Sequence, residues 1–372
     1  MPTLSTAREW GLWTGQKKLE TKAELMTAKV LVNVEEKAGG GKKGWEWHGG
    51  FKLEAKPRPN NTYYPPSCSG YAITYHKASE TIYVYGGIPC VGSIQNGIRP
   101  HFYKFVESKW SEVKPESSYL PAARYGHTLT AHNKELILLG GVSEYKEKLK
   151  DRCFYSDCAA YSTQKNTWRI LESSGQLVKT RKDHTTVTYR NHLIVFGGLD
   201  EGGEAIATIS WINLETKKPR WKEFTLEGRF NHSMVVNEVD NGKHFLSIFG
   251  GRDSRSEIVN TLFFVPLTIW EGELAIREYT TIAHGMMPRE LCVMTEMKAG
   301  FVVLGGSVGG GEAVGDSWYY NAERQTLQEL RVWAEEEDLR GSRYCRLRDE
   351  SIYMLTPHSH SHKAVTLVPL SA

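Results

Sequence analysis

The most regular feature of the chain is a short apolar run that ends in two glycines. Each run is rich in β-branched and aromatic residues at consecutive positions, which is typical of a strand covered on both faces. First glycines of successive runs are 54, 57, 53 and 55 residues apart, and the runs are Ile82–Gly87, Leu136–Gly141, Leu193–Gly198, Phe245–Gly251 and Phe301–Gly306. A period of roughly 50 residues predicts a propeller or a solenoid.

Polar and apolar positions around each run follow one order, which is clearest in the second repeat. An alternating strand follows Pro121–Thr128, and the glycine-terminated strand comes after a turn at His132–Lys134. An aromatic strand then covers Phe154–Tyr161, and a last strand opens at Thr167-Trp168. The pattern therefore predicts four strands per repeat.

Composition and charge change this picture little. Hydrophobic residues make up 40% of the 372 residues and charged residues 24%, and the repeats occupy most of the chain, which favours one large domain. The formal net charge of +3 is too small to indicate a nucleic-acid partner. Residues 1–60 carry 11 Lys and Arg against 7 Asp and Glu, so RNA binding through this leader stays open as a minor alternative.

The cysteines and the hydropathy of the chain indicate a cytoplasmic protein. Its six cysteines show neither a CxxC pair nor zinc-type spacing, and a domain of this size has no need of disulfides. No stretch approaches the roughly eighteen apolar residues of a membrane span, and Met1–Gly15 lacks the pattern of a signal segment. We therefore expect free thiols and no membrane insertion.

Three features together resemble the kelch-repeat β-propellers: the double glycine, the upstream Arg-x-x-His, and the aromatic strand followed by tryptophan. The resemblance covers roughly residues 60 to 356. A sixth, degenerate repeat is visible, in which Arg343–Arg346 leads to Ser351–Leu355 and Thr356-Pro357 stands in place of the glycine pair. The resemblance implies an all-β, six-bladed kelch β-propeller.

The sixth repeat supplies three strands, of which the last is expected at Ala364–Leu370. A blade of three strands would leave an unpaired edge that invites aggregation. We expect residues 28–55 to supply the missing strand, because they hold strand patterns at Ala28–Val34 and around Trp45-Glu46-Trp47. The propeller domain then spans residues 28–372, and residues 1–27 form an N-terminal arm.

Arginines just before the innermost strands are the most regular polar feature: Arg124, Arg181, Arg229, Arg289 and Arg343. The kelch resemblance implies that they rim the mouth of the central channel and contact the carboxylates of an acidic partner, at about 1.5–3 kcal/mol per charge-assisted contact. The alternative is that each arginine bonds carbonyls or acidic side chains of its own or the next blade. We name these arginines as candidate partner-binding residues, together with Tyr145 in the loop Val142–Arg152.

Three histidines, His127, His184 and His232, occupy equivalent repeat positions. Equivalence indicates a role in the blades, and we expect neither a catalytic nor a metal-binding trio from them.

Two other residue sets bear on metal binding. Glu312, Asp316 and Tyr320 are spaced like the iron motif of plant specifier proteins, but Tyr320 stands where that motif has histidine. Three further histidines alternate with serines near the C-terminus, at His358, His360 and His362. On an extended segment they would share one face, yet no carboxylate or cysteine adjoins them, so we expect no metal and no cofactor.

The fold that the resemblance implies carries enzymes, adaptors and structural proteins alike, so function depends on the surface. The long loops after the double glycines combine charges with apolar anchors, which suits a protein partner better than a small molecule. We expect a non-catalytic interaction scaffold or adaptor that binds a protein, acidic in character, through its loop face and channel mouth, within a cytoskeletal or other large assembly. The alternative is a metal-dependent enzyme or specifier-type protein that uses the channel mouth.

Overall fold

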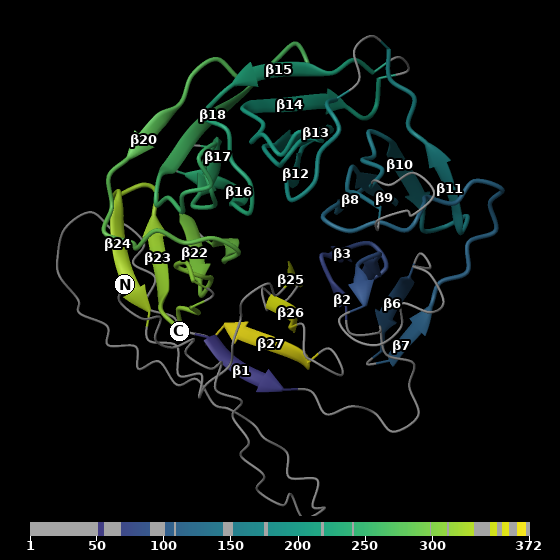
Figure 1. Cartoon of the computed structure of the whole chain (residues 1–372), viewed down its shortest axis with the longest axis horizontal. Coiled ribbons are helices and arrows are strands. Elements are labelled where there is room, and N and C mark those ends of the chain that lie inside the picture. Colours follow the sequence, from purple (N-terminus) through teal and green to yellow (C-terminus); the bar gives the residue numbers. More distant parts are fainter. Residues whose placement is uncertain are drawn as a thin grey trace, which may run out of the picture.

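The computed structural model describes residues 51–55, 68–89, 101–107, 109–143, 152–174, 178–216, 219–239, 242–297, 299–310, 312–330, 343–347, 352–356 and 363–369. The elements of this part of the chain are β-strands joined by turns. Figure 1 shows their sheets arranged radially around one axis, like the blades of a propeller. The all-β propeller predicted from the repeats is therefore confirmed.

Within the described residues, the five double-glycine repeats form five sheets between residues 72 and 330. In four of these sheets the strands are antiparallel and follow one another in sequence order. The first and second sheets hold β3 (Ala72–His76), β4 (Thr81–Tyr85), β6 (Phe102–Val106) and β7 (Lys109–Glu112), then β8 (Thr128–His132), β9 (Glu135–Leu139), β10 (Cys158–Ser162) and β11 (Thr167–Ile170). The third and fifth hold β12 (Thr185–Tyr189), β13 (His192–Phe196), β14 (Thr208–Asn213) and β15 (Lys222–Thr225), then β21 (Val293–Met297), β22 (Gly300–Leu304), β23 (Ser317–Asn321) and β24 (Thr326–Leu330). A short pair, β2 (Cys68–Ser69) and β5 (Ile88–Pro89), lies outside this pattern.

The fourth sheet departs from the predicted four strands per repeat. It contains β16 (Ser233–Val239), β17 (Lys243–Phe249), β18 (Leu262–Trp270), β19 (Glu273–Ala275) and β20 (Thr280–Ile282). β18 is nine residues long, so that its first part pairs with β20 and its last part with β19. The β18–β19 hairpin reaches the third sheet, where the Trp211 indole N–H donates to the Leu274 carbonyl at 3.0 Å and the Leu274 N–H donates to His192 Nε2 at 3.2 Å.

The C-terminal strands and an N-terminal strand share one further sheet. It holds, in spatial order, β1 (Phe51–Ala55), β27 (Lys363–Pro369), β26 (Ile352–Thr356) and β25 (Arg343–Arg346). β1 is antiparallel to β27, with Phe51 opposite Pro369 and Ala55 opposite Val365. Inner strands contact one another in the cyclic order β3, β8, β12, β16, β21, β25 and back to β3. The predicted strands at residues 28–34 and 45–47 lie outside the described residues.

The apolar core lies between neighbouring sheets. Side chains of the third sheet, such as Phe196 and Ile209, pack with Leu246 and Phe263 of the fourth sheet in one cluster. All four are fully buried. Complete burial of a side chain of this size contributes about 1.5–3 kcal/mol, so the interfaces between sheets are the main source of stability.

The double glycines let neighbouring sheets approach each other closely. The backbone of Gly197 has a φ of +66°, and a Cβ atom there would overlap the carbonyl oxygen of Arg229 in the next sheet. The N–H of Gly198 donates to that same carbonyl at 2.7 Å. Only glycine combines this conformation with so close a contact, because it has no side chain.

Candidate functional site

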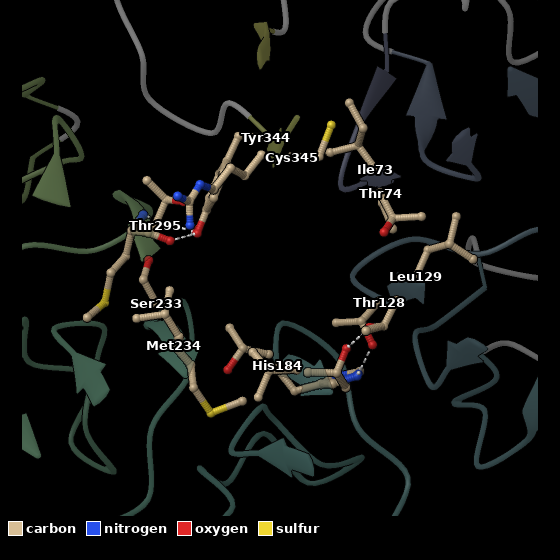
Figure 2. A pocket seen from close by; sticks show the side chains of 18 of the residues that line it. Ile73, Thr74, Thr128, Leu129, His184, Ser233, Met234, Thr295, Tyr344 and Cys345 are labelled. Atoms are coloured by element: carbon tan, nitrogen blue, oxygen red, sulfur yellow. Dashed lines mark hydrogen bonds between the residues drawn. The ribbon is translucent and has the colours of Figure 1, made fainter. Parts of the chain in front are cut away.

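The innermost strands surround a central channel with a volume of about 430 Å³. In Figure 2 the labelled side chains from β3, β8, β16, β21 and β25, and His184 just before β12, encircle its open centre. The lining is rich in hydroxyl groups, which belong to Thr74, Thr128, Thr130, Thr185, Thr186, Thr188, Ser233 and Thr295. The lining is therefore mixed, because apolar residues such as Leu129 and Met234 line the channel as well.

Many of these hydroxyl groups bond to the neighbouring inner strand. The hydroxyl groups of Thr130 and Thr186 are 2.5 Å apart, and Ser233 donates to the carbonyl of Cys292 at 2.6 Å. Each such bond contributes about 0.5–1.5 kcal/mol net. These hydroxyl groups therefore help to hold the inner strands together.

Two of the repeat histidines also bridge neighbouring sheets. Nε2 of His184 lies 3.1 Å from the hydroxyl of Thr128, as Figure 2 shows, and Nε2 of His232 lies 2.6 Å from that of Thr185. Burial, together with the nearby charge of Arg229, lowers the pKa of His232 to about 3. So weak a base does not take up a proton near neutral pH, and the Thr185–His232 pair is therefore a structural link and no general base for a nucleophile.

A chain of backbone hydrogen bonds runs along one mouth of the channel, past five of the inner strands. In each bond a backbone N–H donates to a backbone carbonyl of the preceding sheet, at distances of 2.8–3.1 Å. The pairs, with the donor first, are Gly126 and Gly70, Asp183 and Gly126, Asn231 and Asp183, and Leu291 and Asn231. All five residues have φ between 54° and 65°, a region that costs a non-glycine residue about 1–3 kcal/mol. The side chains of Asp183, Asn231 and Leu291 line the channel at this mouth. We call this end of the propeller the loop face, since the turns after the double glycines lie here too.

A repeated arginine network lies behind this mouth and joins each sheet to the one before it. Nη1 of Arg181 donates to the carbonyl of Gly197 in its own sheet at 3.0 Å, and the carbonyl of Arg181 accepts from the N–H of Gly141 in the preceding sheet at 2.8 Å. The same pair of bonds recurs at Arg124, Arg229 and Arg289. All four arginines are 0–1% exposed.

Aspartates neutralise two of these buried arginines. Arg124 forms a two-point ion pair with Asp157 at 2.5 and 2.9 Å, and Arg289 forms one with Asp316 at 2.5 and 2.7 Å. Although burial alone would raise it, hydrogen bonds from Arg289 and Trp318 hold the pKa of Asp316 below its usual value.

The other two arginines differ from this pattern. Arg229 pairs with Glu227 at 3.2 Å and lies over the ring of Phe263. Arg181 has no carboxylate partner among the described residues, and burial lowers its pKa to about 10.

Comparison with known proteins identifies the family. The family model described as the KLHDC2/KLHL20/DRC7 Kelch-repeats domain matches residues 52–228 and 183–364, which together are most of the chain. The chain belongs to the kelch-repeat family. The kelch resemblance of the sequence motifs is thereby confirmed.

Several curated proteins are similar to this kelch chain over part of their length. Adagio-like protein 3 from Oryza sativa subsp. japonica is 29% identical over 213 residues, which cover 54% of this chain and 32% of the relative. Dynein regulatory complex subunit 7 from Chlamydomonas reinhardtii is 28% identical over 163 residues, which cover 39% of this chain and 13% of the relative. Kelch domain-containing protein 3 from Rattus norvegicus is 29% identical over 119 residues, covering 32% of this chain and 29% of the relative. The matched part thus spans about a third or less of each relative.

The kelch arginines are buried, whereas the sequence resemblance implied that they rim the channel mouth and contact an acidic partner. Arg124, Arg181, Arg229 and Arg289 do not present their guanidinium groups to solvent at the channel mouth. Their bonds to carbonyls and carboxylates of the blades are those of the alternative role. An acidic partner in direct contact with these four groups therefore has no support in the geometry.

The structure does not describe every predicted site residue. The backbone of Arg343 lies in β25, but its side chain is not among those described, and Tyr145 lies outside the described residues. Sequence reasoning missed the contribution of Asp183 and Asn231 to the mouth, since positive φ at these positions follows from contact with the preceding sheet. It also missed Asp157 as a partner of Arg124, although one signal was available, namely an acidic residue directly before the third strand of a repeat.

The residue sets considered for a metal do not form a site in the described part of the chain. No group of three or more His, Cys, Asp or Glu side chains is placed there to hold a metal ion. Asp316 is bound by Arg289 and Trp318, and Tyr320 is buried in the core. The alternating histidines at residues 358–362 lie outside the described residues. The same part of the chain contains no helix that is long and apolar enough to cross a membrane.

Proposed function

We propose that this kelch propeller is a non-catalytic scaffold or adaptor in the cytoplasm, which binds a protein partner through the loop face and the channel mouth. The observation that carries the proposal is the exposure of apolar side chains at this end. Leu120 is 50% exposed and Met287 54% exposed, in the turns that lead to Arg124 and Arg289. Exposed apolar residues on a face that also carries charged loops are typical of a protein interface.

The rigidity of the loop face supports this proposal. Its turns are tied to two sheets at once by the arginine network and by the chain of backbone hydrogen bonds at the mouth. A surface that is already ordered loses little conformational entropy when a partner binds. The buried arginines then act by holding the binding surface in place, and the partner contacts the residues around them.

Assembly into a larger complex is part of the proposal. One of the relatives is named as a subunit of a dynein regulatory complex, and its similarity to this chain covers kelch repeats. From this likeness we propose that the chain belongs to a cytoskeletal or other large complex. The likeness covers only a small part of that relative.

We also propose that the ring is a six-bladed propeller closed by the N-terminal strand, within a domain that spans residues 28–372. The cyclic contacts of the inner strands and the pairing of β1 with β27 support this arrangement. Closure by strands from both ends of the chain would remove the last free sheet edges.

Quantitative co-purification from cells tests the binding face. We expect Leu120→Lys combined with Met287→Lys to lose partners that the wild-type chain retains. The matched control is Trp270→Lys, since Trp270 is 71% exposed at the far end of β18, away from the double glycines. All variants should show the wild-type unfolding midpoint. Loss of the same partners with the control, or their retention by the double variant, would contradict the proposed face.

A further inference from the structure

Arg181 holds its guanidinium group in the same way as the two arginines that bind aspartate. Its Nε donates to the carbonyl of Lys179 at 3.0 Å and its Nη1 to the carbonyl of Gly197 at 3.0 Å. Arg124 and Arg289 make the same two bonds, to the residue two positions earlier and to the glycine sixteen positions later. In all three sheets the edge of the guanidinium group that carries Nη1 and Nη2 therefore faces the start of the third strand.

The residue at that start is an aspartate in the sheets of Arg124 and Arg289 but not in the sheet of Arg181. The N–H of the first glycine donates to the carbonyl of Asp157 in the second sheet and of Asp316 in the fifth, at 3.4 and 3.1 Å. In the third sheet the corresponding bond goes to Thr208, at 3.5 Å. A threonine cannot neutralise a guanidinium group. The residue two positions earlier is no substitute either, since it is Lys179, whereas Arg229 has Glu227 there.

Arg181 is consequently a buried cation with an unpaired donor. Its side chain is fully buried, and Nη2 has no hydrogen-bond acceptor among the described residues. Among the described residues, Glu223 is near enough to favour the charged form, and it accepts a hydrogen bond from Ser210 at 3.1 Å. A buried charge without a partner costs several kcal/mol, so a ligand that supplies the missing carboxylate gains free energy at this donor. Because Nη2 is closed to solvent, neighbouring side chains move aside when such a ligand enters.

We propose that the Nη1–Nη2 edge of Arg181 binds a small free carboxylate, of the size of formate, in the position that aspartate fills in the second and fifth sheets. A planar carboxylate accepts two parallel hydrogen bonds from this edge, as Asp157 and Asp316 do. The side chains of these two aspartates are 27% and 24% exposed, so in the second and fifth sheets this position lies next to solvent. The ligand is small because the side chain of Thr208 already fills the space that the Cβ atom of the aspartate fills in the other two sheets.

Binding at Arg181 has a consequence for the channel mouth, which goes beyond the proposed docking function. Arg181 and Asp183 belong to the same turn, and Asp183 forms part of the chain of backbone hydrogen bonds at the mouth. A bound carboxylate stabilises that turn and thereby the mouth. Lys179 and Lys182, both partly exposed, add to the positive potential that favours an anion there, although each also contacts an aspartate.

Calorimetric titration with sodium formate, together with thermal unfolding in formate and in sodium chloride of equal ionic strength, tests the proposal. We expect the wild-type chain to bind one equivalent and to unfold at a higher temperature in formate than in chloride. Thr208→Asp supplies the carboxylate internally, so it should raise the midpoint in chloride and weaken formate binding at least about tenfold, or 1.4 kcal/mol. Arg181→Met should abolish the formate effect.

Asp157→Thr provides a second, independent variant, because it recreates the Arg181 environment at Arg124. It should be less stable than the wild type in chloride and should regain more stability in formate. Equal midpoints of the wild type in formate and chloride, with no heat of binding, would mean that the site stays closed to carboxylates and would overturn the proposal. An equal formate effect in the wild type and Arg181→Met would assign the effect to another site.

Discussion

The ion pair between Arg289 and Asp316 offers a sharp test of how the blades are held together. Arg289 is fully buried, and it donates to both carboxylate oxygens of Asp316 and to two backbone carbonyls. Asp316→Ala removes the counter-charge and leaves the guanidinium group in place. The same change also removes the acceptor of the Trp318 indole N–H, which is 2.6 Å from Asp316.

The magnitude follows from the burial of the two partners. Removing one member of a fully buried pair costs about 3–5 kcal/mol, because the other charge stays buried without a partner. Since the Asp316 side chain is 24% exposed, water replaces part of its contribution, and we expect the lower end of that range, about 3 kcal/mol. Asp316→Asn should cost less, because its amide oxygen still accepts one hydrogen bond.

Urea unfolding followed by far-ultraviolet circular dichroism measures the effect. A double-mutant cycle with Arg289→Met separates the ion pair from the packing of each side chain. We expect the double variant to be more stable than the sum of the two single losses predicts. An unchanged midpoint for Asp316→Ala, or strict additivity in the cycle, would refute the account in which carboxylates neutralise the buried arginines.

Three further predictions concern the glycines, the histidines and the last sheet. Gly197→Ala should lower the free energy of unfolding by several kcal/mol more than Gly203→Ala. Both glycines have positive φ, but only at Gly197 would the new Cβ atom overlap the next sheet. Urea unfolding midpoints of the two variants check this. Because burial lowers the pKa of His232 to about 3 from 6.5, the unfolded chain binds a proton that the folded chain does not, so stability is complete above pH 6.5 and declines toward pH 3. Between pH 6.5 and 5.5 the loss should be about 1 kcal/mol, and His232→Gln should show a flatter profile of stability against pH. Truncation of residues 1–55 removes β1 and should lower the unfolding midpoint or cause aggregation. Wild-type behaviour of this variant in thermal unfolding and light scattering would argue against closure through β1.

The repeat pattern was sufficient to predict the blades because each blade has the same local order of strands and turns. The apolar runs correspond to β4, β9, β13, β17 and β22, and each ends at its double glycine. These elements depend on alternation, β-branched residues and turn residues, which are local properties of the sequence. The predicted third strand of the last repeat, Ala364–Leu370, likewise lies within one residue of β27, Lys363–Pro369.

Other features depended on contacts that no local pattern records. The long β18 and its hairpin with β19 stay in place through bonds to Trp211 and His192 of the preceding sheet. The four described arginines looked like solvent-exposed rim residues in the sequence, yet their side chains turn inward. The orientation of a side chain on a turn depends on which backbone carbonyls lie nearby, and these belong to glycines sixteen or more residues away.

By itself, the sequence determined the class of fold, the position of the strands and the need for glycine where sheets meet, since strand propensity and steric freedom act within a few residues. Only the tertiary structure decided what the polar residues do. Packing of one sheet on the next buries the arginines, pairs three of them with carboxylates and leaves Arg181 without one in the described part of the chain. The balance of charge and burial depends on residues that are brought together by the ring and that lie far apart along the chain.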